Sequence, residues 1–117
     1  MWVHFTPVGP TFDSQNMSKY MKTDIQLEVI FKIKQLRQHD KISQAHLADI
    51  LSLSSYGLIG SIESTKYPHK YTLAQLKILS DHFEFPFSNL FLTDEECALP
   101  KEKFVKVLIN KIIEYGK

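Results

Sequence analysis

The side chains of this sequence with the widest chemical repertoire are five histidines and one cysteine, which can bind metals or take part in catalysis. The histidines lie at positions 4, 39, 46, 69 and 82, and no two have a zinc-ligand spacing with a supporting cysteine or carboxylate motif. Cys97 follows Asp94, Glu95 and Glu96, an acidic setting that is expected to raise the pKa of its thiol. We therefore predict neither a metal site nor a reactive cysteine.

Other catalytic motifs do not stand out either. The sequence has no glycine-rich phosphate loop, no Ser/His/Asp order and no paired-carboxylate pattern. It therefore predicts a protein that is not an enzyme, with no cofactor and no evident small-molecule substrate.

Length and composition indicate one small globular domain. The chain has 117 residues, 44% of them hydrophobic, and 14 Lys and Arg against 13 Asp and Glu. A single cysteine leaves no internal disulfide to form, which favours a reducing compartment. No apolar run approaches the roughly 20 residues of a membrane-spanning helix, and the first residues lack the pattern of a secretory signal. We therefore expect a cytoplasmic protein that does not enter a membrane.

Charge is distributed unevenly along the chain. Residues 19–82 hold nine Lys and Arg against six acids, whereas residues 83–117 hold five lysines against six acids. This excess is compatible with phosphate binding and equally with an ordinary solvated surface.

The elements that must position any site read as helices. Residues 1–22 have the composition of a flexible arm, followed by an amphipathic helix whose apolar residues recur at three- and four-residue spacing up to about residue 39. Ser43 is an N-cap for a second, short helix, on which the small side chain of Ala48 allows close helix crossing. Residues 55–63 form a third segment, where Gly57 and Gly60 make an isolated helix weak, so tertiary packing must hold it.

The second half of the sequence is also helical. Capping boxes at Thr72 with Gln75 and at Thr93 with Glu96 mark helix starts, and Pro68 places residues 64–71 in a loop. We expect helices over 73–83, 88–92 and 101–115, the last with a broad apolar stripe. No segment reads as a strand.

In order, spacing and residue type, residues 25–92 resemble the lambda-repressor/Cro-like helix-turn-helix family, often called the XRE family. The segments that carry this resemblance are IKQLR at 33–37, SQAHLADILSLS at 43–54, IGSIE at 59–63, LKILSDHF at 76–83 and LF at 90–91. The resemblance implies an all-α protein, a five-helix bundle with an additional C-terminal helix. It also implies binding of double-stranded DNA, commonly as a dimer on a two-fold site.

The resemblance also implies roles for individual residues. The third helix would enter the major groove, and Glu63 would be a structural acid that bonds to nearby backbone or basic side chains rather than to DNA. The implied DNA contacts are a phosphate contact from Gln44, groove contacts from Ser54, Ser55, Tyr56 and Ser61, and phosphate contacts from Lys66 and Lys70, with Tyr71 beside them.

Two departures from the family pattern bear on this function. The interval from Leu53 to Glu63 is one residue longer than usual, which we place around Gly57, and the third helix lacks Arg, Lys, Asn and Gln, the residues that make bidentate base contacts. Weak sequence specificity follows, or a surface used for a protein partner, as in a toxin–antitoxin or mobile-element regulatory component. Tyr56 could likewise reach the groove or pack on Leu53.

The chain is thus expected to comprise an arm at 1–22, a DNA-binding domain at 23–93 and a C-terminal helical segment at 94–117. The apolar stripe of the last helix could complete the core of the monomer or pair with a second chain. Of these two, we favour a homodimer of a transcriptional regulator.

Overall fold

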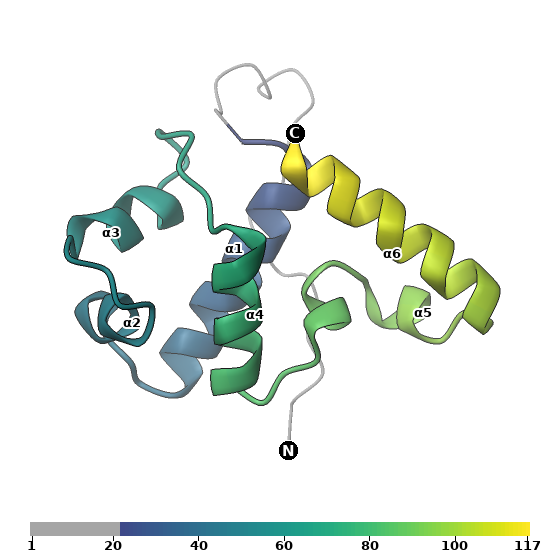
Figure 1. The fold of residues 1–117 in the computed structure, drawn as a ribbon, viewed down its shortest axis with the longest axis horizontal. Helices are drawn as coiled ribbons and strands as arrows, with labels where there is room; N and C mark the ends of the chain where they lie inside the picture. The colour runs from purple at the N-terminus through teal and green to yellow at the C-terminus, as the bar shows by residue number, and fades with distance from the viewer. Residues whose placement is uncertain (1–21) are drawn as a thin grey trace.

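The helices of this protein surround one long central helix, as the computed structural model shows for residues 22–117 (Figure 1). These residues contain no strand, which confirms the all-α class. In chain order, the elements are α1 (Asp24–His39), α2 (Gln44–Ile50), α3 (Gly57–Glu63), α4 (Leu73–His82), the 3-10 turn η2 (Phe87–Leu90), α5 (Asp94–Cys97) and α6 (Lys101–Gly116).

Helix starts follow the local capping chemistry. The predicted capping boxes at Thr72 and Thr93 are both formed, and Thr23 makes a third one with Gln26 at the start of α1. The hydroxyl of Ser43 accepts a hydrogen bond of 3.0 Å from the amide of His46, as predicted for the start of α2. Side chains close in sequence therefore satisfy one free backbone amide at each of four helix N-termini.

Three helices end in the same way, with a non-glycine residue in the left-handed region. Lys41, Ser52 and Glu84 have φ values of 57°, 58° and 52°, directly after the C-caps of α1, α2 and α4. In each case the next residue donates its amide back to a carbonyl in the last turn, as Ile42 does to Arg37 at 2.9 Å. This turn folds an apolar side chain back against the bundle.

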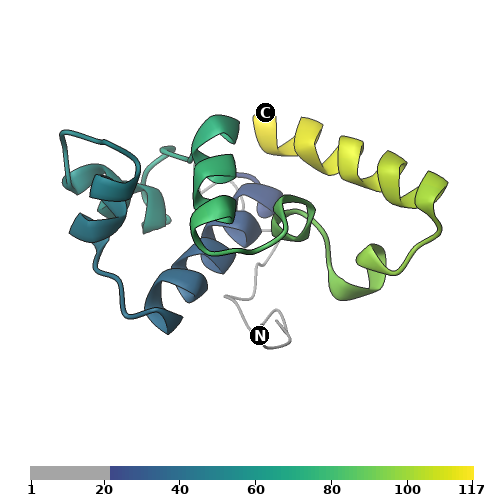
Figure 2. The same ribbon diagram turned by 60° about the horizontal axis from the view of Figure 1, so that its bottom comes forward.

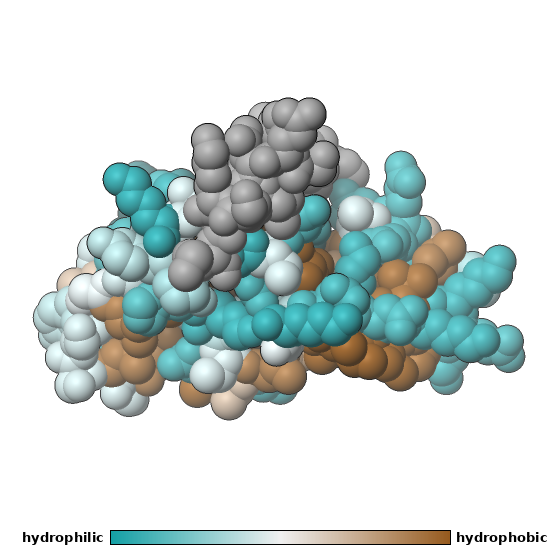
Figure 3. Space-filling view, turned by 90° about the horizontal axis from the view of Figure 1, so that it is seen from above, coloured by the Kyte–Doolittle hydropathy of each residue, from teal (hydrophilic) through white to brown (hydrophobic). Residues whose placement is uncertain are grey.

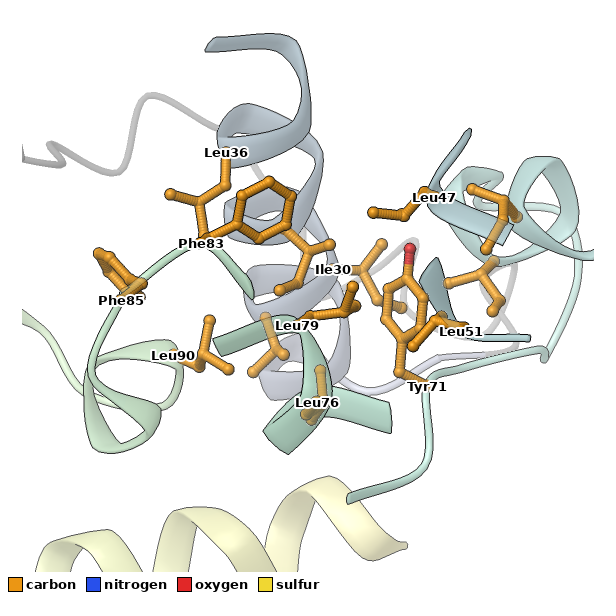
Figure 4. Packing of buried hydrophobic residues seen from close by; sticks show 14 of the residues in the cluster. Ile30, Leu36, Leu47, Leu51, Tyr71, Leu76, Leu79, Phe83, Phe85 and Leu90 are labelled. Carbon is orange, nitrogen blue, oxygen red and sulfur yellow. The ribbon is translucent and has the colours of Figure 1, made fainter. Parts of the chain in front are cut away.

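The core is built on α1. Val29, Ile33 and Leu36 are completely buried, and the other core helices pack around them. Figure 4 shows Leu76 and Leu79 of α4 and Leu90 of η2 in the cluster beside α1. On the side of α2, Leu47 and Leu51 lie near Tyr71.

Helix α6 lies at the opposite end of the molecule from α2 and α3 (Figures 1 and 2). Its C-terminal turn is fixed to the bundle, because Gln26 donates to the carbonyl of Tyr115 at 2.7 Å and the Tyr115 hydroxyl donates to the carbonyl of Tyr71 at 2.6 Å. Leu108 and Ile112 pack against the core as well. One part of the apolar stripe therefore completes the core of the monomer.

The junction with the preceding segment differs from the prediction. Lys22, expected at the end of a flexible arm, is buried and lies against α3. Residues 1–21 of the expected arm lie outside the described residues. Among residues 22–117, no helix is both long and apolar enough to cross a bilayer.

Candidate nucleic-acid interface

Helices α2 and α3 pack on one another through small and branched apolar side chains at one end of the molecule. Leu47 and Ala48 of α2, and Ile59 and Ile62 of α3, are almost completely inaccessible to solvent. The complete burial of Ala48 agrees with the expectation of a close helix crossing at this position. This contact leaves the opposite side of α3 facing away from the core.

Helix α3 has little intrinsic stability. It has seven residues, two of them glycines, and its N-cap residue Tyr56 makes no capping hydrogen bond with its side chain. It begins at Gly57. Contacts from other elements therefore have to hold α3, as expected from its sequence.

The first of these contacts is an ion pair between α1 and the end of α3. Nε and Nη2 of Arg37 each lie 2.9 Å from a carboxylate oxygen of Glu63, and Nη1 donates to the carbonyl of Ile42 at 2.9 Å. Gln44 of α2 donates from Nε2 to Oε1 of Glu63 at 3.0 Å. The predicted structural role of Glu63 is confirmed, and one carboxylate joins three helices.

The second contact comes from Lys22. Its ammonium donates to the carbonyl of Ser64 and, at 3.4 Å, to that of Ser61, so a positive charge lies at the C-terminal end of α3. Burial lowers the pKa of Lys22. Sequence reasoning missed this residue because the contact spans about forty residues and no local pattern marks it.

The outward side of α3 and its preceding turn carries small hydroxyl groups. Ser54 and Ser55 are exposed, whereas Ser61 is half-buried. Tyr56 is 54% exposed, and the nearby carboxylate of Asp49 raises the pKa of the Tyr56 phenol. The tyrosine is therefore at the surface beside α2.

The residues expected near DNA phosphates after α3 are Lys66, Lys70 and Tyr71, and the two lysines have different environments. Lys66 is exposed, and its backbone amide donates to the Ser64 hydroxyl at 3.1 Å. Lys70 donates its ammonium to the Tyr115 carbonyl at 3.0 Å and lies 5.5 Å from the centre of the Tyr115 ring. This contact directs Lys70 toward α6, whereas Lys66 lies at the surface.

Tyr71 requires a correction. Its side chain is completely buried in the core, so it cannot lie beside phosphate groups at the surface. Its hydroxyl has no hydrogen-bond partner among the described residues, and burial raises its pKa. Residues 64–71 were predicted to form a loop, which has no periodic pattern to indicate burial. The sequence therefore did not reveal that Tyr71 turns inward to fill the space between α2 and α4 (Figure 4).

Metal-binding and nucleophilic groups are not clustered in residues 22–117. No three His, Cys, Asp or Glu side chains in this part of the chain are placed to hold a metal ion. Cys97 donates to the side-chain oxygen of Asn89 at 3.2 Å, and its thiol pKa is raised, mainly by burial and further by Asp94 and Glu96. The direction of this shift agrees with the expectation from the acidic sequence context.

Comparison with family models, with curated proteins and with solved structures returned no match for this chain.

Proposed function

We propose that this protein binds double-stranded DNA through α2 and α3, with α3 in the major groove. The observation that carries the proposal is that α3 buries Ile59 and Ile62 while the hydroxyl-bearing residues before it remain exposed at one end of the molecule. Major-groove recognition needs a helix that packs on the bundle with one side and leaves its other side accessible to DNA.

The support for α3 fits this role. Lys22, Arg37 and Gln44 reach α3 or its end from elements outside it, so its position does not depend on its own weak helix propensity. A pre-positioned helix loses less conformational entropy when it binds. Fixed placement would allow hydroxyl groups at its N-terminal end to meet base edges.

Affinity would come chiefly from phosphates and specificity would be weak. Lys66 offers an exposed ammonium near the end of α3, and Gln44, whose side-chain amide donates one hydrogen bond to Glu63, is exposed at the start of α2. Ser54, Ser55, Tyr56 and Ser61 offer hydroxyls, which discriminate among bases less strongly than bidentate amide or guanidinium groups. The protein would act as a cytoplasmic transcriptional regulator with degenerate site preference.

A protein-binding role for the same surface is the second candidate. Asp49 lies beside Tyr56, and the one charged residue of α3, Glu63, is an acid that pairs with Arg37. A carboxylate near the expected groove side opposes a polyanion. These features favour a polar protein partner if duplex DNA is not bound.

A gel-shift titration with salt tests the proposal. Binding through several phosphates must weaken steeply between about 50 and 200 mM salt. Lys66→Ala should reduce the slope of the logarithm of the binding constant against the logarithm of salt concentration by about one. Lys103→Ala, an exposed lysine on α6, is the matched control and should leave the slope unchanged. Absence of binding at about 50 mM salt would contradict DNA binding and favour the protein-partner role.

Selection of bound duplexes from a random pool tests the assignment of the reading residues. Tyr56→Phe and Ser55→Ala keep the shape of the surface but remove hydroxyls, so they should change the base preference at one or two positions. Lys66→Ala should weaken binding to all sequences alike. Identical preferences for the wild type and both hydroxyl variants would place base reading elsewhere.

A further inference from the structure

Helix α6 has an apolar edge that residues 22–117 do not cover. Val105, Ile109 and Ile113 are 42%, 51% and 55% exposed, beside the buried edge of the helix. Their spacing of four residues places them on one side of α6, over about two turns. We call these three residues the exposed α6 row. Figure 3 shows hydrophobic side chains on this end of the molecule, and such a continuous apolar surface marks an interface more often than isolated exposed residues do.

The described chain begins beside one end of this row. Lys22 is buried, and Gln26, at the start of α1, donates from Nε2 to the carbonyl of Tyr115 at 2.7 Å. Tyr115 follows Ile113, the last residue of the row, by two residues. Figure 1 likewise shows the start of α1 next to the C-terminal end of α6. The twenty-one residues that precede Lys22 are therefore joined to the molecule close to the exposed α6 row.

This segment is long enough to reach the whole row. Val105, at the far end of the row, precedes Tyr115 by ten residues. Ten residues of helix are about 15 Å long, whereas the ten residues from Phe12 to Lys22 can extend to about 33 Å. Every residue up to Phe12 can therefore reach any part of the row.

The composition of residues 1–21 suits an apolar surface. Trp2, Val3 and Phe5 lie within four residues of one another, and we call them the N-terminal apolar group. Fully extended, the chain from Trp2 to Phe5 covers about 10 Å, and the exposed α6 row covers about 12 Å of helix. The group is therefore of a size to cover the row.

Charge and tethering favour this segment over a second copy of the chain. Residues 101–117 hold five lysines and two glutamates, so pairing two α6 helices brings like charges together. Residues 1–21 hold one lysine and one acid, so no such repulsion opposes them. A segment joined by a short linker also acts at an effective concentration in the millimolar range. It would therefore occupy the row before a second copy at micromolar concentration does.

We propose that residues 1–21 fold back on α6 and that the N-terminal apolar group packs on the exposed α6 row. The segment then completes the apolar surface within one chain, in place of the homodimer expected from the sequence. The proposal does not depend on DNA binding, since α6 and α3 lie at opposite ends of the molecule (Figure 2).

The fluorescence of Trp2, the single tryptophan of the sequence, tests this contact in the full-length protein. In the wild type, the emission should be shifted to the blue and protected from acrylamide quenching, because the indole lies against apolar side chains. Ile109→Glu places a charge at the centre of the row, and it should shift the emission to the red and raise the quenching constant several-fold. Ile78→Glu is the matched control, because Ile78 is 45% exposed on α4 and lies outside the row, and it should change neither quantity.

Removing the N-terminal apolar group tests the same contact from the other side. The double variant Trp2→Ser, Phe5→Ser leaves the row uncovered, so it should bind more of the dye anilinonaphthalene sulfonate, which binds exposed apolar surface, than the wild type does. Adding Ile109→Glu to this variant should remove that gain. Circular dichroism confirms that each variant is folded.

Sedimentation equilibrium separates this contact from a dimer. The wild type should keep the monomer mass of 13.6 kDa at concentrations where Trp2 is protected. Protection of Trp2 that appears only together with twice that mass would overturn the proposal and assign the row to a second copy. A wild-type Trp2 as accessible to acrylamide as that of Ile109→Glu would overturn it too, and so would equal changes in Ile109→Glu and Ile78→Glu.

Discussion

Arg37 and Glu63 form a bidentate ion pair that joins the last turn of α1 to the last residue of α3. Both N–O distances are 2.9 Å, and the side chains are only 11% and 4% exposed. The third nitrogen of the guanidinium donates to the carbonyl of Ile42, and Gln44 completes the hydrogen bonding of the carboxylate. Such a pair holds its partners in one geometry because every polar atom has a defined partner.

Removing one member of this pair should destabilise the fold strongly. Arg37→Met leaves the Glu63 carboxylate buried without its main partner, and we expect a loss of about 3 kcal/mol in the free energy of unfolding, measured by urea denaturation. The double variant Arg37→Met, Glu63→Leu should be more stable than Arg37→Met alone, because it removes the buried charge that was left unpaired.

The exposed pair of Lys77 and Asp81 is a control for this experiment. Its N–O distance is 2.7 Å, yet both side chains are more than 60% exposed. Asp81→Asn should therefore change the free energy of unfolding by less than about 0.5 kcal/mol. If Arg37→Met lowers the free energy of unfolding by no more than Asp81→Asn does, the buried ion pair contributes no more to stability than a surface ion pair.

The two buried tyrosines should respond in opposite ways to the loss of a hydroxyl. Tyr71→Phe removes a buried hydroxyl that has no partner among the described residues, so stability should stay constant or rise by up to about 1 kcal/mol. Tyr115→Phe removes the 2.6 Å hydrogen bond to the carbonyl of Tyr71 and should cost about 1–2 kcal/mol. Thermal unfolding of both variants measures the difference, and equal losses would contradict the assigned hydrogen bonding.

The same tyrosines predict a loss of stability at alkaline pH. Burial raises the pKa of Tyr71 and of Tyr115 above the ordinary value of 10.0. Above that pH, the unfolded chain releases phenolic protons that the folded chain retains, so the free energy of unfolding falls as the pH rises. Urea denaturation at a series of pH values above 10.0 should show a smaller decline for Tyr71→Phe than for the wild type.

The left-handed residue after α1 offers a stabilising substitution. Lys41 has a φ of 57°, a conformation that costs a side-chain-bearing residue about 1 kcal/mol relative to glycine, and its side chain is exposed. Lys41→Gly should therefore raise the free energy of unfolding by about 0.5–1 kcal/mol. Lys34→Gly places a glycine inside α1 and should lower the free energy of unfolding by about 1 kcal/mol, so it controls for the general effect of glycine.

Local patterns in the sequence were sufficient to predict α1, α2, α4 and α6, whereas the helix expected over 88–92 is the 3-10 turn Phe87–Leu90. The apolar spacing before residue 39 and the caps at Ser43, Thr72 and Thr93 lie within a few residues of the groups they contact, and the structure forms all of them. The structural role of Glu63 was also predicted, through the family resemblance. The DNA-binding role of the surface around α3 stays a prediction.

The tertiary structure alone decided which side chains are free to act. Lys22 reaches the end of α3, Lys70 turns to Tyr115, and Tyr71 enters the core, through contacts that span about forty residues or more. Sequence periodicity records only which side of its own helix a residue occupies, whereas these contacts depend on how the helices cross. The sequence by itself therefore determined most helices and their apolar faces. The packing of those faces determined that Lys66 remains at the surface and that Val105, Ile109 and Ile113 of α6 are left exposed.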